Sequence, residues 1–241
     1  MISETESAEL GQGLYSFGEV AQYLRVNVNT LRSWFRSYGG RHPIITGSIS
    51  QSQDKRLWLS FHDFIEAYII HYLKGEGVKP PDLREAIEEC KKKYNLSYPL
   101  SHKGHVVMVD RATGRVLVLP PNEHHPVEVT GPHKGQKMAM QIVRDYLRKL
   151  EFDEHTALVN RFIVMERKFP GGRIRRIVME PGLNFGEPTV EGTPYRASTL
   201  REALMAEGDP KKTAKIYGVG KSDIIIATAA FDNHLGLRLA A

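Results

Sequence analysis

The sequence predicts an α+β fold in which helices dominate both ends of the chain and strands dominate its middle. Apolar residues recur at helical spacing before residue 95 and again after residue 198. Between these parts, two runs rich in β-branched residues flank a turn near residue 112. We therefore expect three regions: a helical head over residues 14–98, a β-rich connector over residues 99–172 and a helical tail over residues 173–241.

Composition limits the classes of protein to which this chain can belong. Of its 241 residues, 41% are hydrophobic and 25% are charged, which is typical of soluble globular proteins. No apolar run approaches the ~20 residues that span a bilayer, and the acidic start is unlike a signal peptide. Cys90 is the only cysteine, which favours a reducing compartment and a packed thiol. We expect a cytoplasmic protein.

The net charge of +5 is unevenly distributed. Residues 99–175 hold 13 Lys and Arg against 8 Asp and Glu, whereas the two flanking parts are balanced. A basic segment suits nucleic acid or an acidic protein surface. Composition leaves both partners open.

Two short helices are expected between residues 15 and 38. Ser16 can cap the first helix, and Glu19 stands where the second half of a capping box belongs. Arg25-Val26-Asn27 forms the turn, because Asn tolerates left-handed backbone angles and can cap the next helix.

The second of these helices has a polar and basic outer face. Its apolar stripe is Leu31, Trp34 and Phe35, at i, i+3 and i+4. Side chains on the other face can bond to base edges or phosphates, since a helix fits the major groove. With the turn, the candidate DNA contacts are Arg25, Asn29, Thr30, Arg32, Ser33 and Arg36. An ordinary helical hairpin with a solvated face has the same pattern.

The stretch SFGEVAQYLRVNVNTLRSWFR resembles the start of MerR-like winged helix-turn-helix domains. The resemblance implies that residues 29–36 form the recognition helix and that a basic wing follows over residues 41–59. Arg41, Lys55 and Arg56 are the candidate wing contacts. Two further helices, one capped by Ser60 with Asp63 and one opened by Pro80-Pro81, resemble the remainder of such domains.

The connector carries strand signals and no recognisable catalytic group. Strands are expected over 105–109 and 115–119, with a third over 127–130, a helix over 136–147, and two more strands over 158–165 and 173–179. Five histidines fall between His102 and His133, but exposed loop histidines are commoner than a metal site at such spacing. With no phosphate loop or activated nucleophile, we expect no enzyme activity, cofactor or metal.

Three short helices are expected in the tail, over Ser198–Glu207, Pro210–Tyr217 and Ser222 to about His234. Asp209 and Ser222 are the expected caps of the second and third. The third helix is apolar nearly all round, which indicates burial at an interface. A trihelical dimerisation core is therefore favoured over a second DNA-reading unit.

The tail resembles a bacterial trihelical domain whose genes stand beside PIN-type ribonuclease toxins. Gly186, Pro188, Gly192 and Thr193 match that domain's loop. Where the family has Arg after the Gly-Thr pair, this chain has Pro194, with Arg196 two residues later. A MerR-like head with this tail is similar to a subfamily of VapB-type antitoxins.

The combined resemblance implies a homodimeric antitoxin that binds its own operator DNA and neutralises a PIN-domain ribonuclease toxin. A basic surface could cover the acidic pocket in which such a nuclease holds Mg²⁺. The candidate toxin contacts are Arg161, Arg167, Lys168, Arg173, Arg175 and Arg176. A solvated strand face explains these six equally well, and a stand-alone MerR-like transcription regulator is the alternative function.

Overall fold

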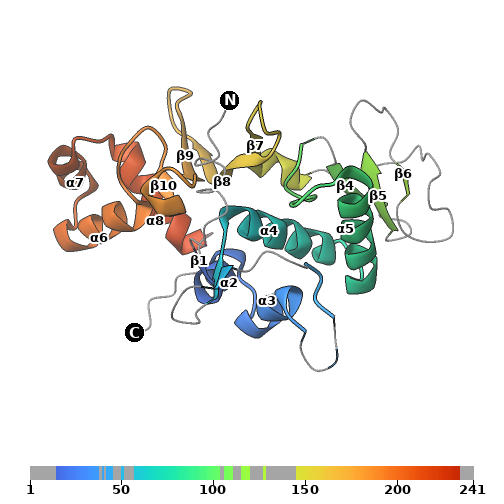
Figure 1. The fold of residues 1–241 in the computed structure, drawn as a ribbon. Helices are drawn as coiled ribbons and strands as arrows, with labels where there is room; N and C mark the ends of the chain where they lie inside the picture. The colour runs from blue at the N-terminus through green and yellow to red at the C-terminus, as the bar shows by residue number, and fades with distance from the viewer. Residues whose placement is uncertain are drawn as a thin grey trace.

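A computed structural model describes residues 15–37, 40, 42–45, 50–51, 57–103, 106–110, 115–119, 127–128 and 145–233. It is a mixed helical and antiparallel-strand fold, as the α+β prediction requires. Helix α4 runs through the middle of the molecule, with α2 and α3 on one side and strands β7–β9 on the other (Figure 1). Helices α6–α8 lie at one end, and α5 with β4–β6 lies at the opposite end.

The first part of the chain forms two helices and a small sheet. Strand β1 (Tyr15–Ser16) leads into α2 (Phe17–Leu24) and α3 (Val28–Phe35), and β2 (Ser50–Gln51) and β3 (Leu57–Leu59) follow. The sheet order is β1-β3-β2, all antiparallel. The predicted capping box is confirmed, since the Glu19 amide donates to Ser16 Oγ over 3.2 Å and the Ser16 amide donates to Glu19 Oε2 over 2.7 Å.

Helix α4 (Phe61–Gly75) is the central element of the core. The predicted Ser60–Asp63 capping box is confirmed, and it is buried. Ten residues of α4 are buried, including His62, Asp63 and Glu66, so this helix has almost no solvent face at its start. Helix α5 (Pro80–Tyr94) begins at the predicted Pro pair and buries Cys90.

The connector contains the predicted meander. Strands β4 (Val106–Asp110), β5 (Arg115–Leu119) and β6 (Val127–Glu128) form an antiparallel sheet in that order. The segment before β7 is a 3₁₀ helix, η1 (Asp145–Lys149), and residues 136–144 of the helix expected here lie outside the described residues.

A third antiparallel sheet has the order β10-β9-β8-β7. Its strands are β7 (Leu150–Phe152), β8 (Val159–Lys168), β9 (Ile174–Met179) and β10 (Thr189–Val190). The turn between β8 and β9 lies at the predicted Pro170-Gly171-Gly172, where both glycines have positive φ angles of 83° and 78°. Only glycine adopts that backbone freely, which explains the pair. A 3₁₀ turn, η2 (Asn184–Gly186), separates β9 from β10.

Helices α6 (Ala197–Glu207), α7 (Pro210–Tyr217) and α8 (Lys221–Asn233) pack together beside this sheet. Asp209 caps α7 as predicted, because its Oδ1 accepts from the Lys211 amide over 2.7 Å. The prediction that Ser222 caps α8 is wrong. The helix begins one residue earlier, and Asp223 Oδ2 accepts from the Gly220 amide over 2.8 Å. The longer carboxylate reaches back over the turn, which leaves Ser222 inside the helix.

The apolar character of α8 is explained within the chain itself. Ile224, Ile226, Ala227 and Ala230 are fully buried, and α8 packs against α6, α7 and strand β9. Buried residues from Tyr15 to Phe231 form one continuous hydrophobic cluster, so the three predicted regions share a core. Within the described residues, no helix is both long and apolar enough to cross a membrane.

Candidate nucleic-acid interface and basic hairpin

The α2–α3 turn aims the outer face of α3 at solvent. Arg25 ends α2 in the left-handed conformation, with φ of 55°, and Asn27 caps α3 by accepting from the Asn29 amide over 2.8 Å. Leu31, Trp34 and Phe35 are buried against the core. This packing fixes the rotation of α3 about its own axis. The side chains on the opposite face of the helix therefore point to solvent.

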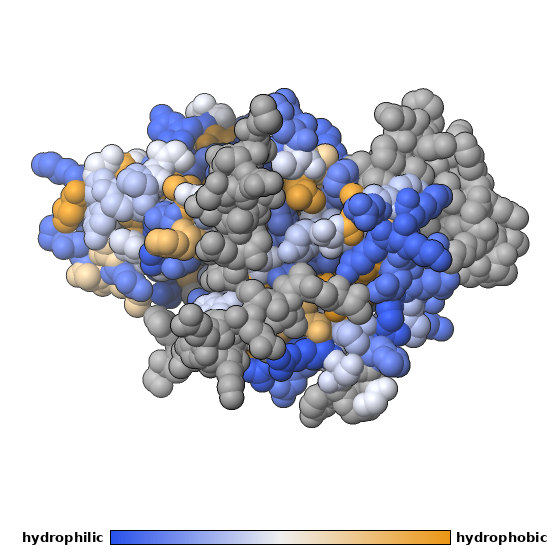
Figure 2. Space-filling view, viewed as in Figure 1, coloured by the Kyte–Doolittle hydropathy of each residue, from blue (hydrophilic) through white to orange (hydrophobic). Residues whose placement is uncertain are grey.

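Five of the six predicted DNA contacts of the helix pair are solvent-exposed. Arg25, Asn29, Thr30, Arg32 and Arg36 are exposed, and Ser33 is half-buried. In the part of the chain that the structure describes, no carboxylate forms an ion pair with Arg25, Arg32 or Arg36. Figure 2 shows hydrophilic residues over the outer surfaces of α3 and α5. Arg41 and Arg56 of the expected wing lie outside the described residues.

The segment that follows α3 is held by contacts that local sequence patterns do not predict. The amides of Ile44 and Ile45 both donate to the Trp34 carbonyl over 2.8 Å. From the other side, Arg84 of α5 donates through Nε to the Pro43 carbonyl over 2.7 Å and through Nη2 to the His42 carbonyl over 2.8 Å. Arg84 is therefore a structural residue of this surface, and no local motif marks it.

Three of the six predicted toxin contacts form ion pairs with carboxylates of the same chain. Arg161 on β8 contacts three carboxylates: Glu180 at 2.5 Å, Glu151 at 3.0 Å and Glu191 at 3.4 Å. Arg175 pairs with the buried Asp223 at 2.7 Å, which fastens β9 to the start of α8. Arg176 pairs with Glu166 at 2.6 Å. These guanidinium groups already have anionic partners.

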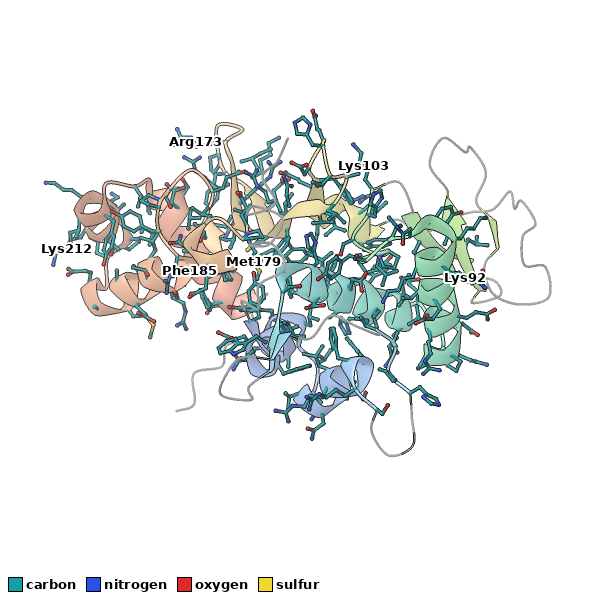
Figure 3. The ribbon with its side chains drawn as sticks, viewed as in Figure 1. Lys92, Lys103, Arg173, Met179, Phe185 and Lys212 are labelled. Carbon is teal, nitrogen blue, oxygen red and sulfur yellow. The ribbon has the colours of Figure 1, made fainter. Side chains whose placement is uncertain are left out.

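The other three predicted toxin contacts surround the turn of the β8–β9 hairpin. Arg167, Lys168 and Arg173 are exposed, and we call these three residues the basic tip. Arg173 projects from this turn at the edge of the molecule (Figure 3). The guanidinium carbon of Arg167 lies 5.3 Å from the ring centre of Phe169, a cation–π distance. The tip is a compact cationic projection with an aromatic residue beside it.

The loop Asn184–Thr193, which carries the four residues predicted from family resemblance, is packed against the rest of the chain. Gly186 and Pro188 are buried, Thr193 is half-buried and Gly192 is exposed with φ of 76°. Thr193 Oγ1 donates to the Val190 carbonyl over 2.9 Å. Arg196 forms an ion pair with Glu187 at 3.0 Å.

A buried polar group lies on α4, away from both surfaces. Glu66 is fully buried and accepts from the Leu100 amide over 3.2 Å. Burial raises the pKa of Glu66 to about 8, although the Leu100 hydrogen bond acts in the opposite direction. One turn earlier, burial lowers the pKa of His62 to about 4, and its ring packs on Tyr98 with centroids 4.9 Å apart.

The histidines and the single cysteine were the remaining candidates for chemistry in the sequence. No group of three or more His, Cys, Asp or Glu residues is placed to hold a metal ion within them. Of the five histidines from His102 to His133, His102 is described and the other four lie outside the described residues. Burial raises the pKa of the Cys90 thiol to about 12, which keeps it protonated and unreactive.

Two curated proteins and one solved structure from Mycobacterium tuberculosis are similar to this chain. No protein-family model matches the chain. A curated protein named "Putative antitoxin VapB45" is 25% identical over 220 residues, which cover 86% of this chain and 88% of that protein. "Uncharacterized protein Rv2308" is 29% identical over 97 residues, covering 39% of this chain and 40% of that protein. The crystal structure of Rv2018 matches with a TM-score of 0.59 at 20% identity, over 90% of this chain and 97% of that one. This structural match shows a shared fold.

Proposed function

We propose that this protein is the antitoxin of a type II toxin–antitoxin system, which binds its own operator DNA and neutralises a PIN-domain ribonuclease. The observation that carries the proposal is the similarity to the putative antitoxin VapB45, which extends over most of both chains. The kind of toxin rests on the resemblance of the tail to domains encoded beside PIN-type ribonucleases.

The DNA-binding part of the proposal rests on the exposed face of α3. We infer that α2, α3 and the β1-β3-β2 sheet form a MerR-like winged helix-turn-helix, with α3 as the recognition helix. Asn29, Thr30 and Ser33 offer hydrogen-bonding groups suited to base edges. Arg25, Arg32 and Arg36 surround them with positive charge that suits phosphates. A homodimer would present two such faces to a palindromic operator.

The toxin-binding part of the proposal centres on the basic tip. Arg167, Lys168 and Arg173 are free of the internal ion pairs that hold Arg161, Arg175 and Arg176. A PIN nuclease presents clustered carboxylates, and guanidinium groups pair with carboxylates through short, charge-assisted hydrogen bonds. We assign the direct contact to the three tip residues and a supporting role in the hairpin to the other three.

Co-expression with the product of the adjacent gene tests this proposal. We expect the two proteins to elute together in size exclusion and the complex to show suppressed RNA cleavage. Changing Arg167, Lys168 and Arg173 together to Gln should weaken the complex by at least tenfold and restore cleavage, because three desolvated charge pairs are lost. Binding is measured by titration calorimetry and cleavage with a labelled RNA.

The matched control changes Lys211, Lys215 and Lys221 to Gln, which removes three exposed cations from α7 and α8. It lowers the net charge equally and should leave the complex intact. If both triple variants weaken binding to the same extent, general charge attraction explains the complex and the assignment to the basic tip is wrong. If the wild-type chain elutes alone and cleavage is unaffected, the antitoxin function is wrong.

A further inference from the structure

Tyr15 joins the start of the chain to a loop near its end. Its hydroxyl donates to the Gly186 carbonyl over 2.8 Å, in a buried hydrogen bond that spans 171 residues of sequence. Tyr15 is only 2% exposed, and burial raises the pKa of its hydroxyl well above the ordinary value. The hydroxyl therefore stays protonated and able to donate.

The acceptor of this bond is held in place by an unusual backbone. Asn184, Phe185 and Gly186 have consecutive left-handed φ angles of 49°, 57° and 76°. Asn and Gly tolerate this conformation, but Phe185 rarely adopts it, so its backbone persists only where surrounding contacts impose it. Asn184 Nδ2 donates to Thr189 Oγ1 over 2.9 Å and to the Pro194 carbonyl over 3.2 Å, and the Glu187 amide donates to the Asn184 carbonyl over 3.1 Å.

Burial of the Phe185 side chain does not explain the backbone conformation of this turn. Phe185 is 74% exposed, so packing of its ring does not offset the strain in its backbone. What the turn achieves is to bury Gly186 and bring its carbonyl to Tyr15. The strain therefore serves the contact between the loop and the first part of the chain.

The donor, Tyr15, is also held in place by its neighbours, and it lies directly before the α2–α3 helix pair. Tyr15 immediately precedes Ser16, the cap of α2, and pairs with Leu59 of β3. Its ring packs edge-on against Tyr23 of α2, with centroids 6.4 Å apart, and against Phe64 of α4 at 5.6 Å. Any motion of α2 and α3 as a body must therefore move the Tyr15 hydroxyl.

We propose that the Tyr15–Gly186 hydrogen bond is a latch that fixes the orientation of the α2–α3 pair relative to the C-terminal sheet and helices. Tyr15 is a positioning residue, because its side chain lies in the core and not on the outer face of α3. In a dimer, the orientation of the two helix pairs sets the distance between the DNA half-sites that they read. The latch then governs half-site spacing, and this consequence rests on the proposed DNA-binding function.

Tyr15→Phe removes the hydroxyl and keeps the ring. Spin labels at Gln22→Cys on α2 and Lys211→Cys on α7 report the orientation directly, since both positions are exposed and the native Cys90 is buried. We expect the measured distance distribution to become at least twice as broad in Tyr15→Phe. Tyr68→Phe is the matched control, because its hydroxyl bonds to the Tyr146 carbonyl and not to the loop. It should retain the wild-type width.

DNA binding supplies the second readout. With operator fragments whose half-sites are moved apart by inserted base pairs, wild type should prefer one spacing. Tyr15→Phe should reduce the ratio of best to worst affinity at least fivefold and change the affinity for a single half-site less than twofold. A general loss of stability would weaken both kinds of fragment together.

The outcomes separate the latch from the proposed function. An unchanged distance distribution in Tyr15→Phe overturns the latch, whether or not the protein binds DNA. A broadened distribution in a protein that binds no DNA supports the latch and overturns the DNA-binding proposal. A broadened distribution with an unchanged spacing preference overturns the role of the latch in operator recognition.

Discussion

The arginines of the α2–α3 pair and the ion-paired arginines of the β8–β9 hairpin have opposite surroundings in space. Arg25, Arg32 and Arg36 are exposed and pair with no carboxylate among the described residues, whereas Arg161 contacts three glutamates. A cation without a partner is available to an anionic ligand at little cost. A cation inside an ion-pair network must first break those pairs. The number of basic residues in a segment is thus a poor guide to its binding surface, and the neighbours of each charge decide.

The largest effect that tests this view concerns the buried carboxyl group of Glu66, which has no cationic partner within hydrogen-bonding distance in the described structure. Its pKa is raised to about 8 from the unfolded value near 4.5. Its contribution to stability is therefore fully present below pH 4.5 and lost as the pH rises through 8. Lys91 opposes the shift and Asp63 reinforces it. Between pH 5 and pH 8, the free energy of unfolding of wild type should fall by about 3–4 kcal/mol relative to Glu66→Gln.

Urea unfolding at pH 5, 6.5 and 8 measures this difference. Comparison of the two proteins removes the contribution of His62, whose lowered pKa acts in the opposite sense and is common to both. Glu202→Gln on the exposed side of α6 is the control and should follow wild type at every pH. Parallel pH profiles of wild type and Glu66→Gln would contradict the assignment of a neutral Glu66.

The next effect compares two arginines on one strand. Arg161→Gln leaves Glu151, Glu180 and Glu191 close together without their shared cation, so we expect a loss of about 1–2 kcal/mol in the free energy of unfolding. Arg167→Gln removes an exposed charge at the turn and should change it by less than about 0.5 kcal/mol. Thermal and urea unfolding at low ionic strength measure both. Equal losses would show that the glutamates around Arg161 do not depend on it.

Local features of the fold were predictable because their signals lie within a few residues of each other. The Ser16–Glu19 and Ser60–Asp63 capping boxes, the β4–β5 hairpin and the three tail helices follow from spacing and turn residues. The outward face of α3 follows from the same periodicity that buries Leu31 and Trp34. The prediction for Ser222 failed because α8 already begins at Lys221, and the Asp223 carboxylate accepts from the Gly220 amide just before the helix.

Contacts between distant segments were not predictable. These contacts decide which candidate site residues are exposed and which are held in ion pairs. Nothing near Arg161 in sequence shows that Glu180 and Glu191 come to it across two strands. Arg84 bonds to a residue 42 positions earlier, and Tyr15 bonds to Gly186, 171 positions later in the sequence. A single sequence gives the types of these residues, while their partners depend on tertiary packing.

The smallest effect is the most direct test of the difference between the two sets of arginines. Arg32→Gln should weaken operator binding about tenfold and lower the magnitude of the slope of log affinity against log salt by about 0.9, because one phosphate contact releases about that many counterions. Arg161→Gln should leave the slope unchanged, since its guanidinium group is held by glutamates and strand β8 lies on the opposite side of α4 from α3 (Figure 1). Lys92→Gln removes an exposed cation from α5 and reports whether charge there contributes (Figure 3). If Arg161→Gln reduced the slope as much as Arg32→Gln, ion-paired and unpaired arginines would contribute equally, and the α3 face would lose its claim to be the DNA-binding surface.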